Sequence, residues 1–369
     1  MNQRAAIKLA AGLAGLAACA AALFAASWWI STMKLIPSPP AAPVWEAVAF
    51  RDLPGWEDDT LINFRRACVQ NREDWCHVRD LRRYIERNFT PYRLTTRDTG
   101  VFTGYYTSLV RGSLIRTDEY KYPILKVPGD LLTVDVGQFL PDCKECQGLR
   151  ITGQKVGTRL VRYPTRQQIQ AANVRDSDVL VWLADPVDAF IMHIQGSGLV
   201  VLPDGKYLPI GFAASNGLQF SGIGRALQRQ EGLRDLSMPS VRRWLRENPD
   251  KAFQYMHMND RYIFFGQTRE DRFPQGAMGV SLTPMRSVAI DPRIVPFGSL
   301  LWINSDRPHL ARLVFAQDTG AAIVGEQRLD FYWGLGEEAF LKAGVMKASG
   351  TYYLLRRKQR RNLDRAVEQ

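Results

Sequence analysis

The chain has 369 residues, more than one compact core usually holds, which predicts two domains. Hydrophobic residues make up 46% and charged residues 23%, a composition that excludes a disordered chain. The net charge of +11 suits an anionic polymer or an anionic membrane surface. Nucleic acid is one such polymer, and peptidoglycan, whose stem peptides carry free carboxylates, is another.

The first 34 residues differ from the rest and predict a membrane attachment. A short basic start with Arg4 and Lys8 precedes 22 residues without a charge, Leu9 to Ile30. That length can span a bilayer as a helix and exceeds the apolar core of a cleaved signal peptide. The residues around Cys19 also resemble a bacterial lipobox, in which Cys19 would be lipidated. Because the residues after Cys19 stay apolar, we favour a signal anchor at 1–34 with a linker at 35–43 over the alternative, a lipoprotein signal.

Downstream of the linker, the apolar spacing predicts a protein that is mainly β with helices. Helical spacing occurs in four segments: 41–89, 165–172, 222–230 and 240–258. Pro249 is expected to break the last of these helices. Short apolar runs between Gly and Pro turns predict strands in the rest of 101–200, and in 261–302 and 313–323. The basic run at 356–369 is expected to be a solvated tail.

Four cysteines remain once Cys19 is assigned to the anchor. An even number of cysteines in an exported protein suggests disulfides. Cys68 and Cys76 lie at neighbouring ends of two helical patterns, so a bridge between them is expected. Cys143 and Cys146 form a single CxxC without the second pair that a zinc ribbon needs, so we expect a local loop disulfide.

Known cofactor and nucleophile motifs are missing from the sequence. The four histidines have no metal-binding spacing, and there is no GxSxG and no Walker A sequence. We therefore expect neither a metal nor a cofactor. Three aspartates inside apolar strands remain as the chemically interesting groups: Asp291, Asp318 and Asp330.

An aspartate at the end of an apolar strand is often only a turn-former. Here three occur within 40 residues, and Asp330 directly precedes Phe331-Tyr332-Trp333. Apolar surroundings and neighbouring carboxylates raise a carboxyl pKa, and an acid that stays protonated near neutral pH is what glycosidic bond cleavage requires. Asp330 is therefore the candidate acid/base, with Asp318 and Asp291 as candidate neighbours.

Several motifs, in order, resemble the membrane-bound lytic murein transglycosylase A family, over roughly Pro43 to Leu355. They are Thr103-Gly-Tyr-Tyr-Thr107, Phe190 to Gly198, Ser215-Asn-Gly217 with Gly222-Ile-Gly-Arg225, Tyr262 to Phe265, Ser287 to Ser299 and the pair Asp318/Asp330. The resemblance implies a double-psi β-barrel catalytic domain, a β-rich second domain inserted into it, and a substrate groove between the two. The corresponding boundaries are 44–108 with 240–355 for the catalytic domain and 109–239 for the insert.

The resemblance also implies a set of substrate-binding residues: Thr103, Gly104, Tyr105, Tyr106, Gln195, Gly196, Ser197, Asn216, Gly217, Tyr332 and Trp333. The expected activity is lytic cleavage of peptidoglycan, with Asp330 as acid and then base and with 1,6-anhydro-muramic ends as products. Asp318 and Asp291 would either tune and orient Asp330 or hold turns.

The alternatives are a water-using, inverting glycoside hydrolase of the cell wall and a non-catalytic murein-binding module. The expected partners are peptidoglycan glycan strands, the membrane through the N-terminus, and other cell-wall enzymes. Because all leading interpretations of residues 1–34 export the chain, nucleic acid is not an expected partner, and the expected location is the periplasm.

Overall fold

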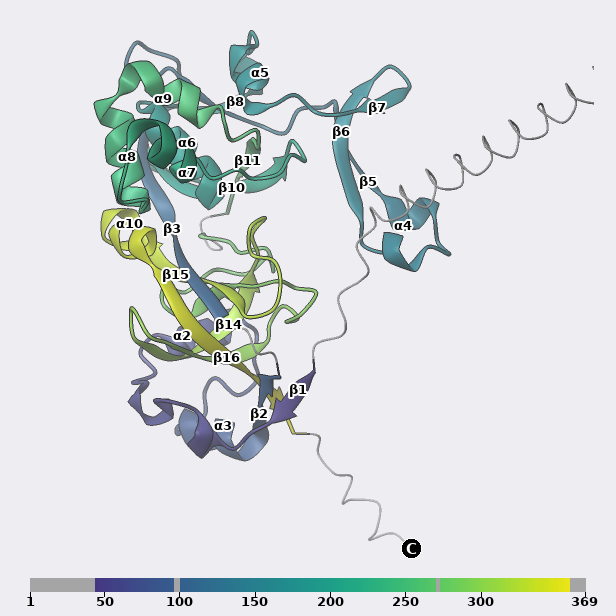
Figure 1. Cartoon of the computed structure of the whole chain (residues 1–369), viewed down its shortest axis with the longest axis vertical. Helices are drawn as coiled ribbons and strands as arrows, with labels where there is room; N and C mark the ends of the chain where they lie inside the picture. Colours follow the sequence, from purple (N-terminus) through teal and green to yellow (C-terminus); the bar gives the residue numbers. More distant parts are fainter. Residues whose placement is uncertain (1–43, 96–99, 270–272, 359–369) are drawn as a thin grey trace, which may run out of the picture. The chain divides into compact units, whose positions relative to one another are not determined.

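A computed structural model describes residues 44–95, 100–269 and 273–358. These are mainly β, as predicted (Figure 1). The strands are β1 (Trp45–Ala47), β2 (Phe89–Leu94), β3 (Gly100–Ser113), β4 (Tyr122–Leu125), β5 (Leu131–Asp135), β6 (Arg150–Val156), β7 (Arg159–Val161), β8 (Val179–Leu183), β9 (Ser197–Val201), β10 (Tyr207–Ser215), β11 (Ile263–Gln267), β12 (Ser287–Ala289), β13 (Leu300–Ser305), β14 (Leu310–Asp318), β15 (Arg328–Leu335) and β16 (Lys347–Arg357). The α-helices are α2 (Phe64–Gln70), α3 (Leu81–Asn88), α4 (Val136–Phe139), α5 (Arg166–Ala171), α6 (Pro186–Gln195), α7 (Gly224–Glu231), α8 (Met238–Glu247), α9 (Pro249–Met256) and α10 (Gly336–Val345).

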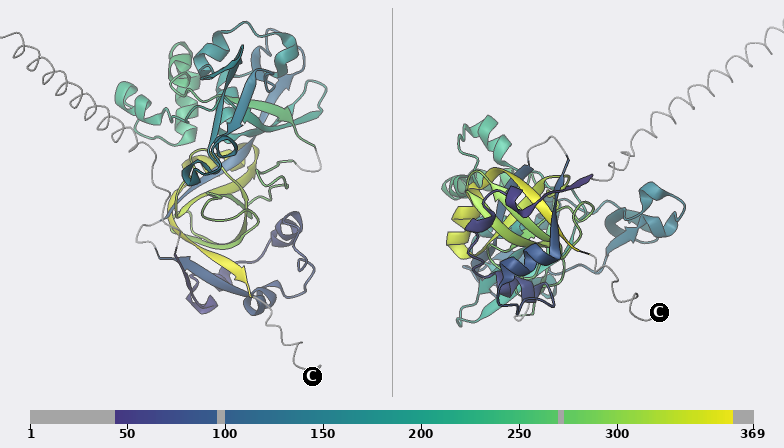
Figure 2. Two further views of the ribbon diagram at one scale, coloured as in Figure 1. Left: turned by 90° about the vertical axis from the view of Figure 1, so that its right-hand side faces the viewer. Right: turned by 90° about the horizontal axis from the view of Figure 1, so that it is seen from below.

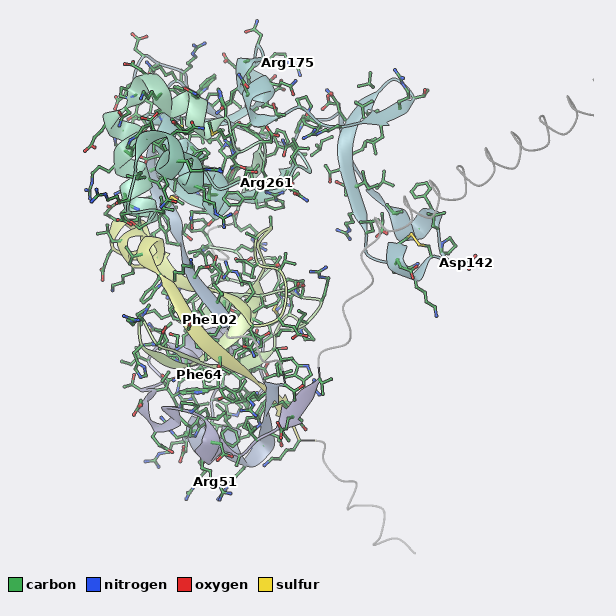
Figure 3. All side chains as sticks on the ribbon, viewed as in Figure 1. Arg51, Phe64, Phe102, Asp142, Arg175 and Arg261 are labelled. Carbon is green, nitrogen blue, oxygen red and sulfur yellow. A yellow bond between two sulfur atoms is a disulfide. The ribbon has the colours of Figure 1, made fainter. Side chains whose placement is uncertain are left out.

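Among the described residues, 134–151 form one compact unit and the others form a second. The smaller unit contains α4 and a 3-10 turn at Lys144–Cys146, between the end of β5 and the start of β6. A disulfide joins Cys143 to Cys146 within it, near the labelled Asp142 in Figure 3. A second disulfide joins Cys68 to Cys76, in the larger unit. Both pairs are those expected from the sequence.

Six strands of the larger unit pair in sequence around a ring (Figure 2). β16 pairs with β13, β13 with β14, β14 with β12, β12 with β15, β15 with β3, and β3 pairs again with β16. The ring therefore combines a strand from the first third of the described chain with strands from its last third. The double-psi crossing of its connections stays a prediction.

Both faces of β13 are buried, because its side chains alternate between two cores. Leu300 and Trp302 join a cluster with Phe64 of α2, whereas Leu301 and Ile303 join a second cluster with strand residues of the ring. The N-terminal helices α2 and α3 thus cover one outer face of the ring. Apolar runs with no polar alternation, as in this strand, are what burial on two faces requires.

A buried ion pair ties the N-terminal segment to the ring. The Arg286 guanidinium contacts both carboxylate oxygens of Asp59 at 2.6 Å, and the two side chains are 0% and 2% exposed. The same guanidinium donates to the carbonyls of Ile62 and Leu313. Every polar group of the pair is therefore engaged in a place that water does not reach.

β3 is long enough to leave the ring and join a second group of strands. Beyond Thr107 it pairs with β9, which pairs with β10, which in turn pairs with β11. Helices α6, α7, α8, α9 and α10 share one apolar cluster beside these strands. Because β3 takes part in both groups, it positions side chains of the ring relative to the second group.

Two helical predictions differ from the structure. The segment 41–89 was expected to be helical, but Trp45–Ala47 is a strand, and the α-helices described there are only α2 and α3. Residues 101–200 were expected to contain one helix, at 165–172, yet they also contain α6. Helices α7, α8 and α9 lie where expected, with α9 beginning at Pro249.

The predicted anchor, its Cys19 and the linker lie outside the described residues, as does most of the basic tail. Within the described ranges, no helix has the length and apolar character needed to cross a membrane.

Candidate active site

Asp330 is placed by the parallel pairing of β15 with β3. In this register Asp330 lies opposite Thr103, and Tyr332 lies opposite Tyr105. Paired residues in neighbouring strands project to the same face, so these four side chains share one side of the sheet. The Thr103 hydroxyl donates a hydrogen bond to Asp330 Oδ1 at 2.5 Å.

The direction of that hydrogen bond is fixed by Arg328. The Arg328 guanidinium donates to Thr103 Oγ1 at 2.9 Å. A guanidinium has no acceptor, so the Thr103 oxygen must accept there and its own proton points to Asp330. Arg328, Thr103 and Asp330 thus form a polar relay that ends on one carboxylate oxygen.

Asp318 lies near Asp330, on β14, the strand on the other side of β12. Ala289 of β12 pairs with Asp318 of β14 and with Asp330 of β15. Two strand spacings separate the two aspartates, which corresponds to about 10 Å between their Cα atoms. Asp318 Oδ1 accepts hydrogen bonds from the amides of Ala277 and Thr319, both at 2.9 Å.

Burial raises the pKa of both aspartates. For Asp330 it outweighs the lowering by the Thr103 hydrogen bond and by the Arg328 charge. For Asp318 burial raises the pKa to about 6, against the amide hydrogen bonds, and the negative charge of Asp330 adds to the increase. Two carboxyl groups with raised pKa values, close together, are typical of sites that carry out proton transfer.

Tyrosines surround the two carboxyl groups. The rings of Tyr105 and Tyr332 lie 5.1 Å apart, and both are buried. Burial, followed by the charges of Asp318 and Asp330, holds the pKa of Tyr105 well above its usual value, so it stays a neutral phenol. The Tyr332 hydroxyl lies 2.8 Å from Thr107 Oγ1, which is 3.3 Å from Ser197 Oγ. These three hydroxyl groups form a hydrogen-bonded series that holds the Tyr332 ring in place.

Asp291 has the contacts of a turn-forming carboxylate. It is 3% exposed and accepts hydrogen bonds from the Arg293 amide, the Arg293 guanidinium and the Gly325 amide. Burial opposes ionisation, but these donors hold the pKa of Asp291 below its ordinary value. Of its two predicted roles, these contacts favour holding the turns.

Strand alternation places two predicted substrate contacts on the opposite face. Trp333 and Tyr106 each follow a residue of the site face, and both pack in the helical cluster. Trp333 Nε1 points to Met346 Sδ at 3.3 Å, and the Tyr106 ring lies 5.2 Å from that of Phe340. A Cβ at Gly104 would lie 2.7 Å from Trp333 Nε1, so Gly104 serves the close approach of that ring. All three thus have packing roles, and their contact with substrate stays a prediction.

The remaining predicted substrate contacts also have structural roles. Ser197 belongs to the hydroxyl series that ends at Tyr332. Gln195 Oε1 accepts a hydrogen bond from the amide of Tyr106. Gly196 ends α6 in the left-handed conformation, with φ +81°. Asn216 is fully buried at the turn that follows β10, and its amide group bonds four backbone groups on three segments, those of Pro164, of Asp260 and Tyr262, and of Leu218. Gly217 has φ +76°, so the Asn216–Gly217 pair builds the turn.

Sequence reasoning missed Arg328 and the two amides that hold Asp318. Arg328 could have been found, because it lies two residues before Asp330 and period-two alternation puts it on the same face. The amides of Ala277 and Thr319 carry no side-chain signal. Thr319 follows Asp318 directly, but Ala277 is 41 residues away.

Family models match most of the described chain. The MltA specific insert domain matches residues 101–266, and the 3D domain matches residues 286–356. The membrane-bound lytic murein transglycosylase A of Escherichia coli (strain K12) is 29% identical over 268 residues, which cover 69% of this chain and 65% of that protein. The chain thus matches just under two thirds of the length of its curated relatives.

Solved structures agree with this assignment. A membrane-bound lytic murein transglycosylase from Agrobacterium tumefaciens is 28% identical, with a TM-score of 0.74, over 85% of this chain and 97% of that one. The monoclinic form of MltA from Neisseria gonorrhoeae is 30% identical, with a TM-score of 0.69, over 88% of this chain and 98% of that one. The chain belongs to the membrane-bound lytic murein transglycosylase A family.

Proposed function

We propose that this protein is a lytic transglycosylase that cleaves the glycan strands of peptidoglycan, with Asp330 as its acid/base. The observation that carries the proposal is the setting of Asp330. Its carboxyl group is half-buried, it has a raised pKa, and Thr103 and Arg328 orient it from one side. The names of the relatives support the same activity.

In the first step, protonated Asp330 donates its proton to the oxygen between N-acetylmuramic acid and N-acetylglucosamine. The bond from that oxygen to the muramic C1 breaks, and positive charge develops on the sugar ring. In the second step, the Asp330 carboxylate removes the proton of the muramic C6 hydroxyl as its oxygen attacks C1. The product is a 1,6-anhydro sugar, Asp330 regains its proton, and no water is consumed. General acid/base catalysis of this kind contributes on the order of 10²–10⁴ in rate.

Thr103 and Arg328 serve both steps. Their relay favours the ionised form of Asp330, while burial favours the neutral form. A residue that must give a proton and then take one back works best when neither form is strongly preferred. Asp318, held by two amides and adjacent to Tyr105, orients and tunes this centre.

The rival enzyme is an inverting hydrolase that uses Asp318 as the base for a water molecule. Inverting enzymes place their two carboxyl groups about 6.5–9.5 Å apart, a range compatible with two strand spacings. Against this role, two amide donors occupy Asp318 Oδ1 and lower the basicity of the carboxylate, so only Oδ2 is left to hold a water molecule. A non-catalytic murein-binding module would not need a carboxyl group at Asp330 whose pKa is raised by burial and lowered by Thr103 and Arg328.

Several parts of the proposal concern the whole molecule. We propose a catalytic domain of residues 44–108 and 240–355, an insert at 109–239, and a glycan-binding groove between them. We also propose that the N-terminus holds the enzyme at the membrane on the periplasmic side, with the uncharged run Leu9 to Ile30 as the anchor. The relatives named membrane-bound support this location.

The test is digestion of purified sacculi in water enriched in oxygen-18, followed by mass spectrometry of the products. The wild type should release anhydromuropeptides that contain no heavy oxygen. Asp330→Asn is nearly isosteric and should retain the fold while losing turnover, and the exposed carboxylate variant Asp118→Asn should match the wild type. Reducing muramic ends labelled with oxygen-18 would instead identify a hydrolase, and full activity of Asp330→Asn would mean that another residue is the acid.

A further inference from the structure

A cavity of about 1140 Å³ is lined by the end of β4 and the residues after it, by the residues around α5, and by Phe264 of β11. Its floor is apolar and is formed by buried side chains of one cluster: Leu125, Tyr163, Ile169 and Phe264. Its rim is formed by the segment after β4, by the residues on both sides of α5, and by Gln154 of β6. Arg175, labelled in Figure 3, stands on this rim. None of these residues takes part in the mechanism above.

The cavity has one anchored carboxylate. Asp130 Oδ1 accepts a hydrogen bond from the Tyr163 hydroxyl at 3.0 Å, and Oδ2 accepts one from Gln154 Nε2 at 2.8 Å. Each carboxylate oxygen can accept a second hydrogen bond, so Asp130 retains capacity for a ligand ammonium. Because two neighbours fix its position, Asp130 would lose little side-chain entropy on binding.

Two cations on the cavity wall have capacity for ligand carboxylates. Among the described residues, Arg162 forms an exposed ion pair with Asp260, at 3.7 Å, and such pairs are worth little. Lys126 Nζ donates one hydrogen bond to the Ser177 carbonyl and has two further donors. By contrast, Arg175 is committed to a bidentate pair with Asp178. The cavity therefore offers two positive groups and one negative group over an apolar floor.

We propose that this cavity binds the stem peptide of peptidoglycan, which makes it a second substrate-binding site. A stem peptide carries more free carboxylates than amines, with short apolar side chains between them. This matches the two available cations, the anchored Asp130 and the apolar floor. The inference rests on the proposed function, because it takes peptidoglycan as the substrate.

The cavity is separate from the aspartate pair. Phe264 of its floor lies on β11, and the pairings β11–β10, β10–β9, β9–β3 and β3–β15 lead from there to Asp330. Four strand spacings correspond to a separation on the order of 20 Å. An extended tetrapeptide spans about 14 Å, so the peptide in the cavity belongs to a different sugar from the one at Asp330. The enzyme would thus recognise peptide substitution at a distance from the bond that it cleaves.

Calorimetry with the full-length protein in detergent micelles tests the binding directly. The probe is a free stem tetrapeptide, L-alanyl-γ-D-glutamyl-meso-diaminopimelyl-D-alanine, together with the same peptide with its carboxylates amidated. Arg162→Gln should weaken binding of the free peptide about tenfold, equivalent to about 1.4 kcal/mol. Amidation should weaken binding to the wild type more than binding to Arg162→Gln, because the variant has already lost that interaction. Arg229→Gln, the same change on an exposed helix outside the cavity, should bind like the wild type.

Turnover provides the second readout. KM is measured on peptide-bearing glycan and on glycan stripped of peptides by an amidase. The ratio of the first KM to the second should be about tenfold higher for Arg162→Gln than for the wild type, with kcat nearly constant. Failure of the wild type to bind the tetrapeptide would overturn the inference, and so would equal losses in Arg162→Gln and Arg229→Gln. Peptide binding without anhydromuropeptide formation would keep the cavity assignment and refute the proposed function.

Discussion

The relay that ends on Asp330 makes a quantitative prediction for Thr103→Val. Valine has nearly the shape of threonine but no hydroxyl, so Asp330 Oδ1 loses its 2.5 Å hydrogen bond, and the Arg328 guanidinium loses its link to the carboxylate. Both interactions lower the pKa of Asp330, whereas burial raises it. The variant should therefore hold its catalytic proton to a higher pH.

The size of the shift follows from the strength of the lost interaction. A hydrogen bond to a charged group is worth about 1.5–3 kcal/mol, and one pKa unit corresponds to about 1.4 kcal/mol. The pKa of Asp330 should thus rise by about 1–2 units. In the proposed mechanism Asp330 must be protonated to start the reaction, so the alkaline limb of kcat/KM should move to higher pH by the same amount. The second step needs the carboxylate to be a good base, and an unoriented carboxylate should lower kcat.

The assay is the pH dependence of kcat/KM for release of anhydromuropeptides from sacculi. Thr103→Ser keeps the hydroxyl and should restore the wild-type profile, which separates the hydrogen bond from a general effect on packing. Circular dichroism should show the same fold in all three proteins. An alkaline limb that stays in place, or that moves to lower pH, would refute the assignment of the Thr103 hydroxyl as the donor that stabilises ionised Asp330.

Four further predictions concern stability, the disulfides and membrane attachment. Arg286→Met leaves the buried Asp59 carboxylate without its partner and should cost about 3–5 kcal/mol in urea unfolding, whereas the exposed Arg229→Met should cost almost nothing. In the wild type burial raises the pKa of Asp59, but Arg286 and the amides of Leu313 and Leu61 together hold it below its ordinary value. The stability from this site is therefore present above about pH 4 and is lost as the pH falls through the folded pKa. Thiol titration of the denatured, unreduced protein should detect no free thiol at the four paired cysteines, and four free thiols would contradict both disulfides: Cys68–Cys76 and Cys143–Cys146. Cys19→Ser should leave membrane attachment and molecular mass unchanged, and loss of attachment would identify a lipoprotein instead.

The fold shows which sequence signals are reliable in this chain. Helix α6 had a start signal in Asp185-Pro186 and a stop signal in Gly196, and the structure uses both: Asp185 accepts from the amides of Val187 and Asp188. It was missed because nearly every side chain from Val187 to His193 is buried. A helix that is buried on all sides has no polar face and therefore no visible period.

The site could be predicted only in part, for a related reason. Asp330 was identified through its aromatic neighbours, yet alternation along β15 turns Trp333 away from it and leaves Tyr332 beside it. The hydrogen bond from Thr103 joins residues 227 positions apart, and no local pattern carries that information. Strand pairing determines which side chains meet, and pairing is a property of the whole ring.

The ring that joins β3 to β15 and β16 also constrains when the centre around Asp330 can form. At synthesis rates of about 5–20 residues per second, roughly 13–50 s pass between Thr103 and the end of β16. Until β15 and then β16 have been made, β3 lacks its neighbours in the ring, and Thr103 has no Asp330 to orient. Contacts between such distant segments also form slowly. If the proposed function holds, an incomplete chain cannot cleave glycan, since the last part of the ring to be made completes the centre around Asp330.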